Sequence, residues 1–238
     1  MTLCLHWSPD SANIVIRMAL ESFALPYEET RLFRGEGDHK SAPHLALNPQ
    51  GLIPVLEDGD LVLFETGAIL FHLCEKMGRC GPDGPPVDDP LTRGALLKWL
   101  FYISNTPHAE MRAMNYAFRY VEGEAAIPAL CTALARRRAA HLSLIEDQLP
   151  QTGGLLGPLT VLETYLASLI RWFQLYSQPE FELAGVEPWP KLHAILSELE
   201  ARPAIRRAFR AEGITGEHPL TAPERPQLPP RPELAARG

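Results

Sequence analysis

Two nearby stretches decide the fold: residues 48–56 read NPQGLIPVL, and residues 63–69 read LFETGAI. The first places Pro54 at the start of a hydrophobic strand, where a proline cannot donate the usual ladder hydrogen bond. A proline at this point indicates a cis bond or a strand edge that must stay free, and a free edge can accept an extended peptide. In the second stretch, Glu65 and Thr66 stand where a strand ends and a helix begins. A hydroxyl beside the free N–H groups of a helix start can bind a carboxylate.

Each feature also has an ordinary structural explanation when it is taken alone. Pro54 could be an edge-strand proline, and Thr66 could be only the N-cap of the next helix. Together, and at this spacing, the two stretches favour a site for a short peptide. In that site the main chain of Val55 pairs with the peptide, and Thr66 binds its α-carboxylate.

The residues around these stretches predict a small α/β domain over residues 1–78. Strands are expected at 2–7, 27–33, 53–56 and 61–64, with helices at 11–23 and 67–77, because the apolar residues change between helical and alternating spacing. The Asp58-Gly59 pair between the last two strands is typical of a hairpin turn. The order of these elements predicts one sheet with helices packed against it.

Residues 79–90 hold four prolines and two glycines, which indicates a linker. Beyond it the pattern is helical at 91–120, 124–149, 161–176, 190–200 and 204–211. Residues 91–216 are therefore expected to form an all-α bundle. Residues 217–238 hold six prolines, which predicts a mobile or surface-draped tail.

Composition narrows the possible functions. The 238 residues are 46% hydrophobic and 21% charged, as in an ordinary globular protein, and the net charge of −7 disfavours nucleic-acid binding. No apolar run is long enough to cross a membrane, and the N-terminus lacks the pattern of a signal peptide. The four cysteines form no C-x-x-C pair and the histidines no H-E-x-x-H motif, so we expect no metal site and a reducing compartment.

The 48–56 and 65–66 motifs resemble the glutathione-site segment of the cytosolic glutathione transferases. The likeness extends over roughly residues 1–212, through the proline-rich linker, the helical half, and Thr160 and Glu163, which resemble the family's helix-capping box. It implies a thioredoxin-like first domain that binds glutathione as co-substrate and a second domain that binds the electrophile. It also implies a cytoplasmic homodimer acting in detoxification, with no metal.

In that family the proline is cis, the residue after it pairs with the cysteinyl group of glutathione, and the acidic–hydroxyl pair binds the γ-glutamyl end. Thr66 stands where the family usually has serine and keeps the hydroxyl. Lys40, with His39 beside it, could reach the glycyl carboxylate, although the simpler explanation is that both are ordinary solvated charges. The glutathione-binding residues implied in this way are Ser11, Asn13, Lys40, Ile53, Pro54, Val55, Glu65 and Thr66.

The chemistry requires a thiolate, and lowering a thiol pKa by about two units takes roughly 2.7 kcal/mol. One hydrogen bond to a charged group supplies about 1.5–3 kcal/mol, so a single hydroxyl at the start of the first helix could suffice. Ser11 is the predicted catalytic residue because it falls at the expected N-cap. Ser8 and Asn13 compete for the role, and Ser11 could also be a plain helix cap. The loop contains no tyrosine or cysteine, which favours serine chemistry.

The electrophile pocket is expected on the first long helix of the second half, around Pro107. A kink there would free carbonyl groups and leave room for a ligand. Tyr102 and Met111 could equally be core residues, and His108 a buried or solvated histidine. The predicted pocket residues are Tyr102, Asn105, Thr106, His108 and Met111.

The sequence is compatible with three functions. The first is a glutathione transferase acting on a small, largely apolar electrophile, or related peroxidase, lyase or isomerase chemistry. The second is a non-catalytic binding or regulatory module of the same fold, since fold alone does not establish activity. The third, a thioredoxin-like oxidoreductase, is disfavoured because residues 7–13 contain no cysteine.

Overall fold

The computed structural model describes residues 2–177 and 179–228. Its first part is a four-stranded sheet in the order β2-β1-β3-β4, with β2 parallel to β1, and with β3 antiparallel to both β1 and β4. The inner strands β1 and β3 contain the buried residues of the sheet, whereas the edge strands are more exposed: β2 reads YEETR and keeps its charged side chains in water, and β4 reads LVLF. The strands are β1 (Leu3–Trp7), β2 (Tyr27–Arg31), β3 (Val55–Asp58) and β4 (Leu61–Phe64).

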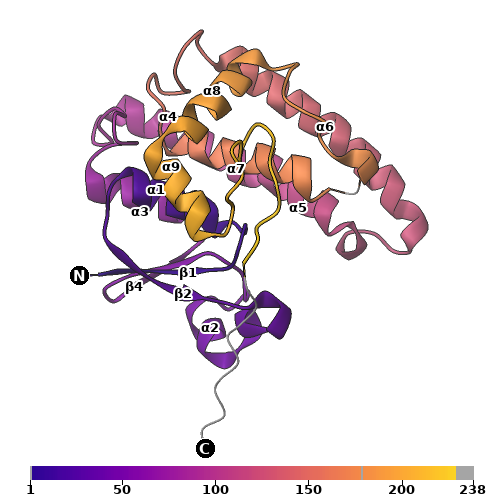
Figure 1. Cartoon of the computed structure of the whole chain (residues 1–238), viewed down its shortest axis with the longest axis horizontal. Helices are drawn as coiled ribbons and strands as arrows, with labels where there is room; N and C mark the ends of the chain where they lie inside the picture. Colours follow the sequence, from indigo (N-terminus) through magenta and orange to yellow (C-terminus); the bar gives the residue numbers. More distant parts are fainter. Residues whose placement is uncertain (1, 178, 229–238) are drawn as a thin grey trace, which may run out of the picture.

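Helices α1 (Asn13–Ser22) and α3 (Thr66–Met77) lie between the sheet and the rest of the molecule, and the short α2 (Ala42–Leu47) lies on the opposite side (Figure 1). Residues 13–20 of α1 are all buried, because the sheet covers one side of the helix and α7 and α9 cover the other. Two single turns of 3-10 helix, Arg34–Glu36 and Asp38–Lys40, precede α2.

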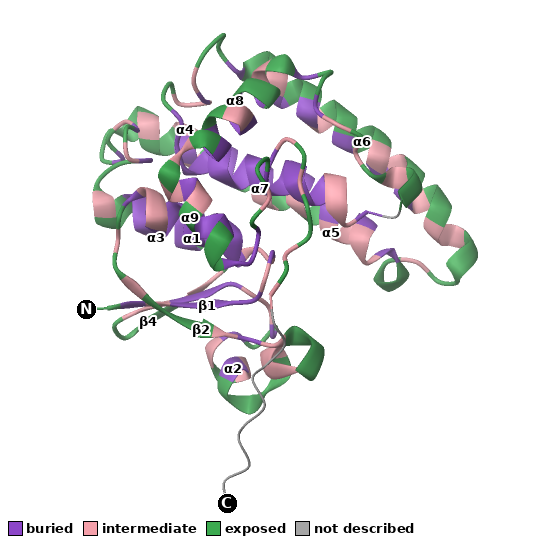
Figure 2. Ribbon diagram, viewed as in Figure 1, coloured by how far each residue is buried: buried purple, intermediate pink, exposed green. Residues whose placement is uncertain are grey.

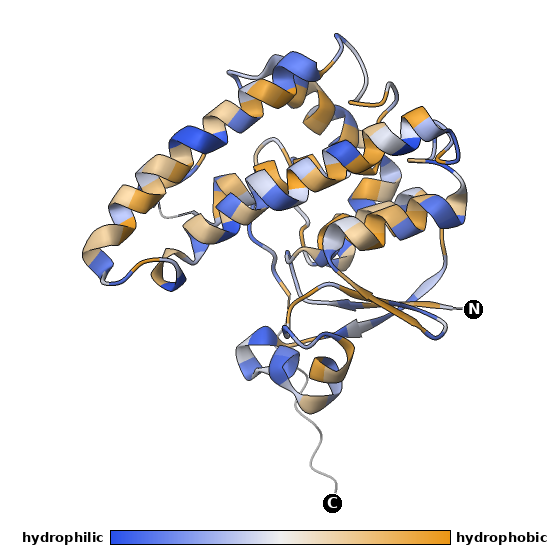
Figure 3. Ribbon diagram, turned by 180° about the vertical axis from the view of Figure 1, so that it is seen from behind, coloured by the Kyte–Doolittle hydropathy of each residue, from blue (hydrophilic) through white to orange (hydrophobic). Residues whose placement is uncertain are grey.

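The second part is helical, as the sequence predicts. Its central helix is α7, which is buried along nearly its whole length (Figure 2) and begins at a complete capping box formed by Thr160 and Glu163. The outer helix α6 instead mixes polar and apolar residues on the side seen in Figure 3, since it faces both core and water. The helices are α4 (Pro90–Ile103), α5 (Ala109–Asn115), α6 (Ile127–Gln148), α7 (Val161–Leu175), α8 (Pro190–Ala201) and α9 (Pro203–Ala211), with a π-helical turn at Ser104–His108.

Two buried ion pairs join the domains, and the hydrophobic pattern gives no sign of either. Asp10, before α1, pairs with Arg171 of α7, and both side chains are fully buried. Glu212, after α9, pairs with Arg17 of α1 and accepts a further hydrogen bond from the Asn13 amide. The ends of these helices are therefore fixed by charges as well as by apolar packing.

The described part of the tail, residues 217–228, lies against the helical domain. Leu220 is fully buried, and the main-chain carbonyls of Pro219 and Glu224 accept hydrogen bonds from Arg171. These contacts use main-chain oxygens, so they leave no periodic pattern in the sequence. Residues 229–238 lie outside the described residues. None of the helices within the described ranges is both long and apolar enough to cross a membrane.

Candidate active site

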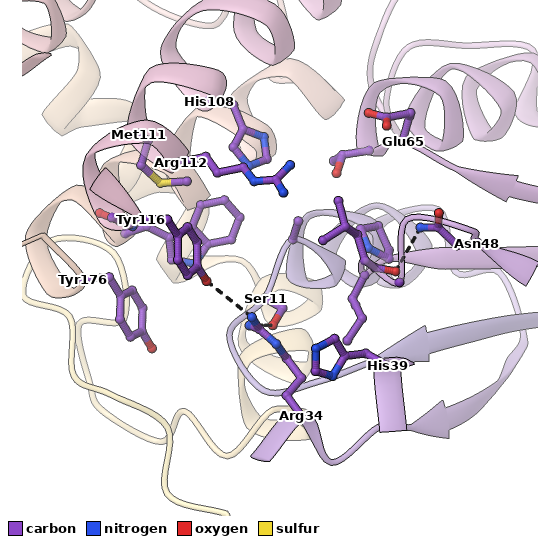
Figure 4. Close-up of a pocket in the computed structure, with 18 of the residues that line it drawn as sticks. Ser11, Arg34, His39, Asn48, Glu65, His108, Met111, Arg112, Tyr116 and Tyr176 are labelled. Atoms are coloured by element: carbon purple, nitrogen blue, oxygen red, sulfur yellow. Dashed lines mark hydrogen bonds between the residues drawn. The ribbon is translucent and has the colours of Figure 1, made fainter. Parts of the chain in front are cut away.

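A cavity of about 450 Å³ opens between the two domains, within the usual range for small-ligand sites. One wall comes from the first domain and the other from the π-helical turn, α5 and α7. The first wall contains Ser11, Ala12, Arg34, His39, Lys40, Asn48, Gly51, Leu52, Ile53, Pro54, Glu65 and Thr66. The second wall contains His108, Met111, Arg112, Asn115, Tyr116, Arg119, Trp172 and Tyr176 (Figure 4).

The Ile53–Pro54 peptide bond is cis, and both residues line the cavity. The predicted pairing role of Val55 is wrong. β3 is an inner strand, so Val55 lies between His6 and Phe64, is fully buried and does not reach the cavity. Ile53 precedes the strand, and its main-chain N–H and C=O make no main-chain hydrogen bond within the described residues. The main-chain groups that are free to pair with an extended ligand are therefore those of Ile53.

Glu65 has a left-handed backbone, with φ of 74°, at the position directly before α3. A non-glycine residue rarely adopts this conformation, and here it accompanies an exposed carboxylate that lines the cavity (Figure 4). Thr66 is the first residue of α3 and is buried. Its hydroxyl is a hydrogen-bond partner of Tyr165 in α7, whose own hydroxyl lies 2.6 Å from Nδ1 of His108. Thr66 thus links the two walls.

Lys40 lies at the open side of the first wall. Its ammonium donates a hydrogen bond of 2.9 Å to the Gln50 carbonyl and so joins the 3-10 turn to the 48–56 segment. Gly51 makes this approach possible: its φ is 61°, and a Cβ atom there would lie 2.6 Å from the His39 carbonyl oxygen. Burial, with the positive charges of Arg34 and Lys40, lowers the pKa of His39.

The expectation that Ser11 caps α1 is wrong, because the N-cap is Ala12 and no side chain caps this helix. Ser11 lies one residue earlier, with its hydroxyl in the cavity and 3.3 Å from Nη1 of Arg34 (Figure 4). The second nitrogen of Arg34 lies 3.3 Å from the Tyr116 hydroxyl, so this arginine bridges the two walls.

Neither competitor of Ser11 reaches the cavity. Asn13 is fully buried, and its amide donates to Glu212 and accepts from the main-chain N–H of Ser8. The expectation that Asn13 binds glutathione is therefore wrong, since its polar atoms already hold the two ends of the fold together. Ser8 is buried as well and lines a separate depression with residues 31–36.

The π-helical turn containing Pro107 forms at the predicted kink and brings His108 and Met111 to the cavity. Burial, helped by the charge of Arg112, lowers the pKa of His108 to about 4, so its ring is neutral at pH 7. The other predicted pocket residues lie elsewhere. The hydroxyl of Tyr102 lies 2.9 Å from Nδ1 of His141 in α6, and Tyr102, Asn105 and Thr106 all lie outside the lining.

Comparison with known proteins agrees with this geometry. Residues 2–75 match the family model described as the glutathione S-transferase N-terminal domain. Glutathione S-transferase GstB of Escherichia coli is 27% identical over 83% of this chain and 93% of its own length. Glutathione S-transferase 4 of Zea mays is 51% identical, over 25% of this chain and about a quarter of its own length. Residues 2–75 thus form a glutathione S-transferase N-terminal domain.

The fold is also that of solved members of the glutathione transferase family. A glutathione transferase homolog from Sulfitobacter, solved with bound glutathione, superimposes with a TM-score of 0.74 at 20% identity, covering 88% of this chain and 98% of that one. The predicted fold, a thioredoxin-like domain followed by a helical one, is thereby confirmed.

Sequence reasoning missed most of the second wall of the cavity. Asn115 and Tyr116 lie three and four residues after Arg112, and Arg119 lies four and three residues after them, so these polar residues share one face of α5 and the turn after it. That spacing was the available signal. Trp172 and Tyr176 gave none, because α7 reads as a buried helix throughout.

One group of possible metal ligands occurs within the described residues: Cys4, His6 and Glu57, on the sheet. Their polar atoms are already engaged, since Nε2 of His6 lies 2.7 Å from the Glu57 carboxylate and the Cys4 sulfur lies 3.7 Å from the Thr30 hydroxyl. Burial raises the pKa of the Cys4 thiol, which disfavours the thiolate that a metal would need.

Proposed function

We propose that this chain binds glutathione in the interdomain cavity and catalyses attack of the glutathione thiolate on an electrophilic carbon. The observation that carries the proposal is the convergence of Ile53, Glu65, Lys40 and Ser11 on the same cavity. The first three are arranged as a peptide would require, and the hydroxyl lies beside a cation. The glutathione bound to the similar Sulfitobacter protein supports the same ligand.

The first wall offers a group for each part of the tripeptide. The free main-chain groups of Ile53 suit the cysteinyl unit, because antiparallel pairing supplies one donor and one acceptor. The Glu65 carboxylate suits the ammonium of the γ-glutamyl unit, and the start of α3 at Thr66 suits its carboxylate. The ammonium of Lys40 suits the glycyl carboxylate.

Activation of the thiol falls to Ser11. Its oxygen accepts from Arg34, so its own proton is free to be donated to the sulfur. A charge-assisted hydrogen bond is worth about 1.5–3 kcal/mol, which lowers a thiol pKa by about one to two units. The start of α1 and the nearby Arg34 guanidinium add positive potential, which also lowers the pKa of the thiol.

Glutathione binding is tested by calorimetry with Glu65→Gln and, as a matched control, with Glu122→Gln at an exposed position outside the cavity. The Glu65 change should weaken binding about tenfold, because it removes one ion pair with the ammonium. The control should bind as the wild type does. Absence of binding to the wild type at millimolar glutathione would refute the proposal.

Catalysis is tested with 1-chloro-2,4-dinitrobenzene, in which sulfur bonds to the ring carbon and chloride leaves. Ser11→Ala should raise the pKa of bound glutathione, read from the ultraviolet absorbance of the thiolate, by about one to two units and reduce turnover at neutral pH. Ser8→Ala should leave both unchanged. If the wild type binds glutathione without lowering its thiol pKa and turns over neither this compound nor a hydroperoxide, the non-catalytic binding module is the better description.

We further propose a homodimer, following the family resemblance. Sedimentation equilibrium at micromolar concentration should give twice the 26.4 kDa chain mass. A single-chain mass over the whole concentration range would exclude it.

A further inference from the structure

The charge of the cavity is opposite to that of the chain. The protein carries a net charge of −7, yet the cavity is lined by four permanent cations, Arg34, Lys40, Arg112 and Arg119, and by one carboxylate, Glu65. An excess of positive charge in a partly enclosed cleft raises the local concentration of anions. Two of these cations, Arg112 and Arg119, stand on the helical wall, away from the segment proposed to bind the peptide.

Arg112 is the central residue of this group. It is half-buried and extends from α5 into the cavity between His108 and Glu65 (Figure 4). Within the described part of the chain its side chain makes no hydrogen bond or ion pair. An arginine in a helix usually pairs with a nearby carboxylate of the protein. Glu110, two residues before Arg112, instead pairs with Arg137 on the far side of the same helix. The carboxylate that Arg112 could have used thus points away from the cavity.

The surroundings of Arg112 are suited to a flat apolar body with one charged end. Met111, Trp172 and Tyr176 line the same wall, and Arg119 lies over the ring of Tyr116 at 4.9 Å. His108 adds no second positive charge, because burial and Arg112 itself lower its pKa to about 4. A guanidinium surrounded by aromatic and thioether groups binds a carboxylate in a planar, two-bonded geometry.

We infer that the electrophile taken by this site is an acid: an apolar, aromatic-sized molecule whose carboxylate pairs with Arg112, with Arg119 at the rim. The inference rests on the proposed function and adds the substrate class to it. The carboxylates of glutathione do not account for Arg112, because Lys40 and the start of α3 serve them on the opposite wall. The reaction is unchanged in kind, since sulfur bonds to carbon and a leaving group departs with its electron pair.

Binding tests the inference without turnover. The probes are S-(4-carboxybenzyl)glutathione and its neutral match, S-(4-carbamoylbenzyl)glutathione, measured by calorimetry. The wild type should bind the acid at least about tenfold more tightly than the amide, and Arg112→Gln should abolish that preference without changing the affinity for glutathione itself. Arg112→Lys, which keeps the charge, should retain part of it. Arg136→Gln, an exposed arginine of α6 outside the cavity, is the matched control and should behave as the wild type.

The two levels of the proposal fail differently. Equal binding of acid and amide, or a preference that survives in Arg112→Gln, overturns the inference and leaves glutathione binding intact. Absence of binding for glutathione and both conjugates overturns the proposed function and the inference together.

Turnover gives a second readout. The pair is 4-chloro-3,5-dinitrobenzoate and its carboxamide, each corrected for its uncatalysed rate with glutathione. In the wild type the corrected kcat/KM should favour the acid about tenfold or more, and added salt should reduce the ratio, because the pairing is electrostatic. A corrected ratio of one, insensitive to Arg112→Gln, contradicts the inference.

Discussion

Replacing Asp10 by asparagine tests whether its buried ion pair with Arg171 holds the two domains together beside the candidate site. The carboxylate of Asp10 accepts hydrogen bonds from Nε and Nη2 of Arg171 at 2.8–3.2 Å, from the Trp172 indole at 3.0 Å and from the Tyr176 hydroxyl at 2.7 Å. Asparagine has nearly the same shape and tolerates the left-handed backbone that Asp10 adopts, with φ of 49°. The change removes the charge and replaces one of the two acceptor oxygens by an NH2 donor, which faces groups that themselves donate.

The expected cost is set by the charge that is left behind. The Arg171 side chain is fully buried, and breaking such a pair by removing one charge costs about 3–5 kcal/mol. Because the amide oxygen still accepts some of the hydrogen bonds, the lower end, about 3 kcal/mol, applies. For a chain of this length that corresponds to a fall in Tm of roughly 6–12 °C.

Urea unfolding followed by circular dichroism and tryptophan fluorescence measures the effect directly. Asp60→Asn, in the exposed turn between β3 and β4, is the control and should change the free energy of unfolding by less than about 0.5 kcal/mol. A loss below about 1 kcal/mol for Asp10→Asn, with an unchanged slope against urea, would falsify the view that this pair joins the domains. Since Ser11 follows Asp10 directly, the variant should also lose turnover more than it loses glutathione affinity.

Three further changes are expected to have measurable effects. Gly94→Ala should raise the free energy of unfolding by about 0.5–1 kcal/mol in urea melts, because Gly94 is an exposed interior residue of α4 with open space at its Cβ position. Leu220→Ala should lower it by about 2–5 kcal/mol, because the tail leucine is fully buried; an effect below about 1 kcal/mol would show that the tail is not packed in solution. His108→Gln should weaken the pH dependence of stability between about pH 6.5 and 4. The imidazole has a lowered pKa of about 4 in the folded protein, so its neutral form stabilises the fold above pH 6.5. That contribution is lost as the pH falls through 4. Urea melts of the wild type and of His108→Gln at pH 7 and pH 4.5 measure this dependence. An equal loss of stability in the two proteins on going to pH 4.5 would contradict the burial of a neutral ring.

The sequence predicts the order of strands and helices closely because each element carries its own period. The first helix is apolar where it meets the sheet, and the strand pair 55–64 is joined by a glycine turn, so local pattern and tertiary fold agree. Element ends are less predictable. Ser11 has the chemistry of an N-cap, but the helix begins after Ala12, because the preceding turn is set by Asp10 and its contacts 161 residues away.

The candidate site divides in the same way. Its first wall could be predicted because it consists largely of main-chain groups and a helix start, which require prolines, glycines and a hydroxyl at fixed spacing. The pairing role predicted for Val55 belongs two residues earlier, at Ile53, since the sequence pattern does not say which neighbour of Pro54 lies inside the sheet. The second wall depends on which face of α5 meets the cavity, and that face is set by packing against α6. Tyr102, on α4, is predicted to line the pocket but turns toward His141 of α6 instead, which is also a matter of tertiary packing.

This difference explains why the sequence predicts the proposed peptide site and does not predict the proposed electrophile site. Recognition by the main chain requires the same few residue types wherever it occurs, so the role of the 48–66 region can be predicted from its sequence alone. Recognition by side chains can change with each residue on the facing helix without disturbing the fold. Arg112 illustrates the point, because its guanidinium makes no hydrogen bond or ion pair with any described group of the protein. A charge that the fold does not use, placed half-buried in a cleft, is best accounted for by the molecule that enters the cleft.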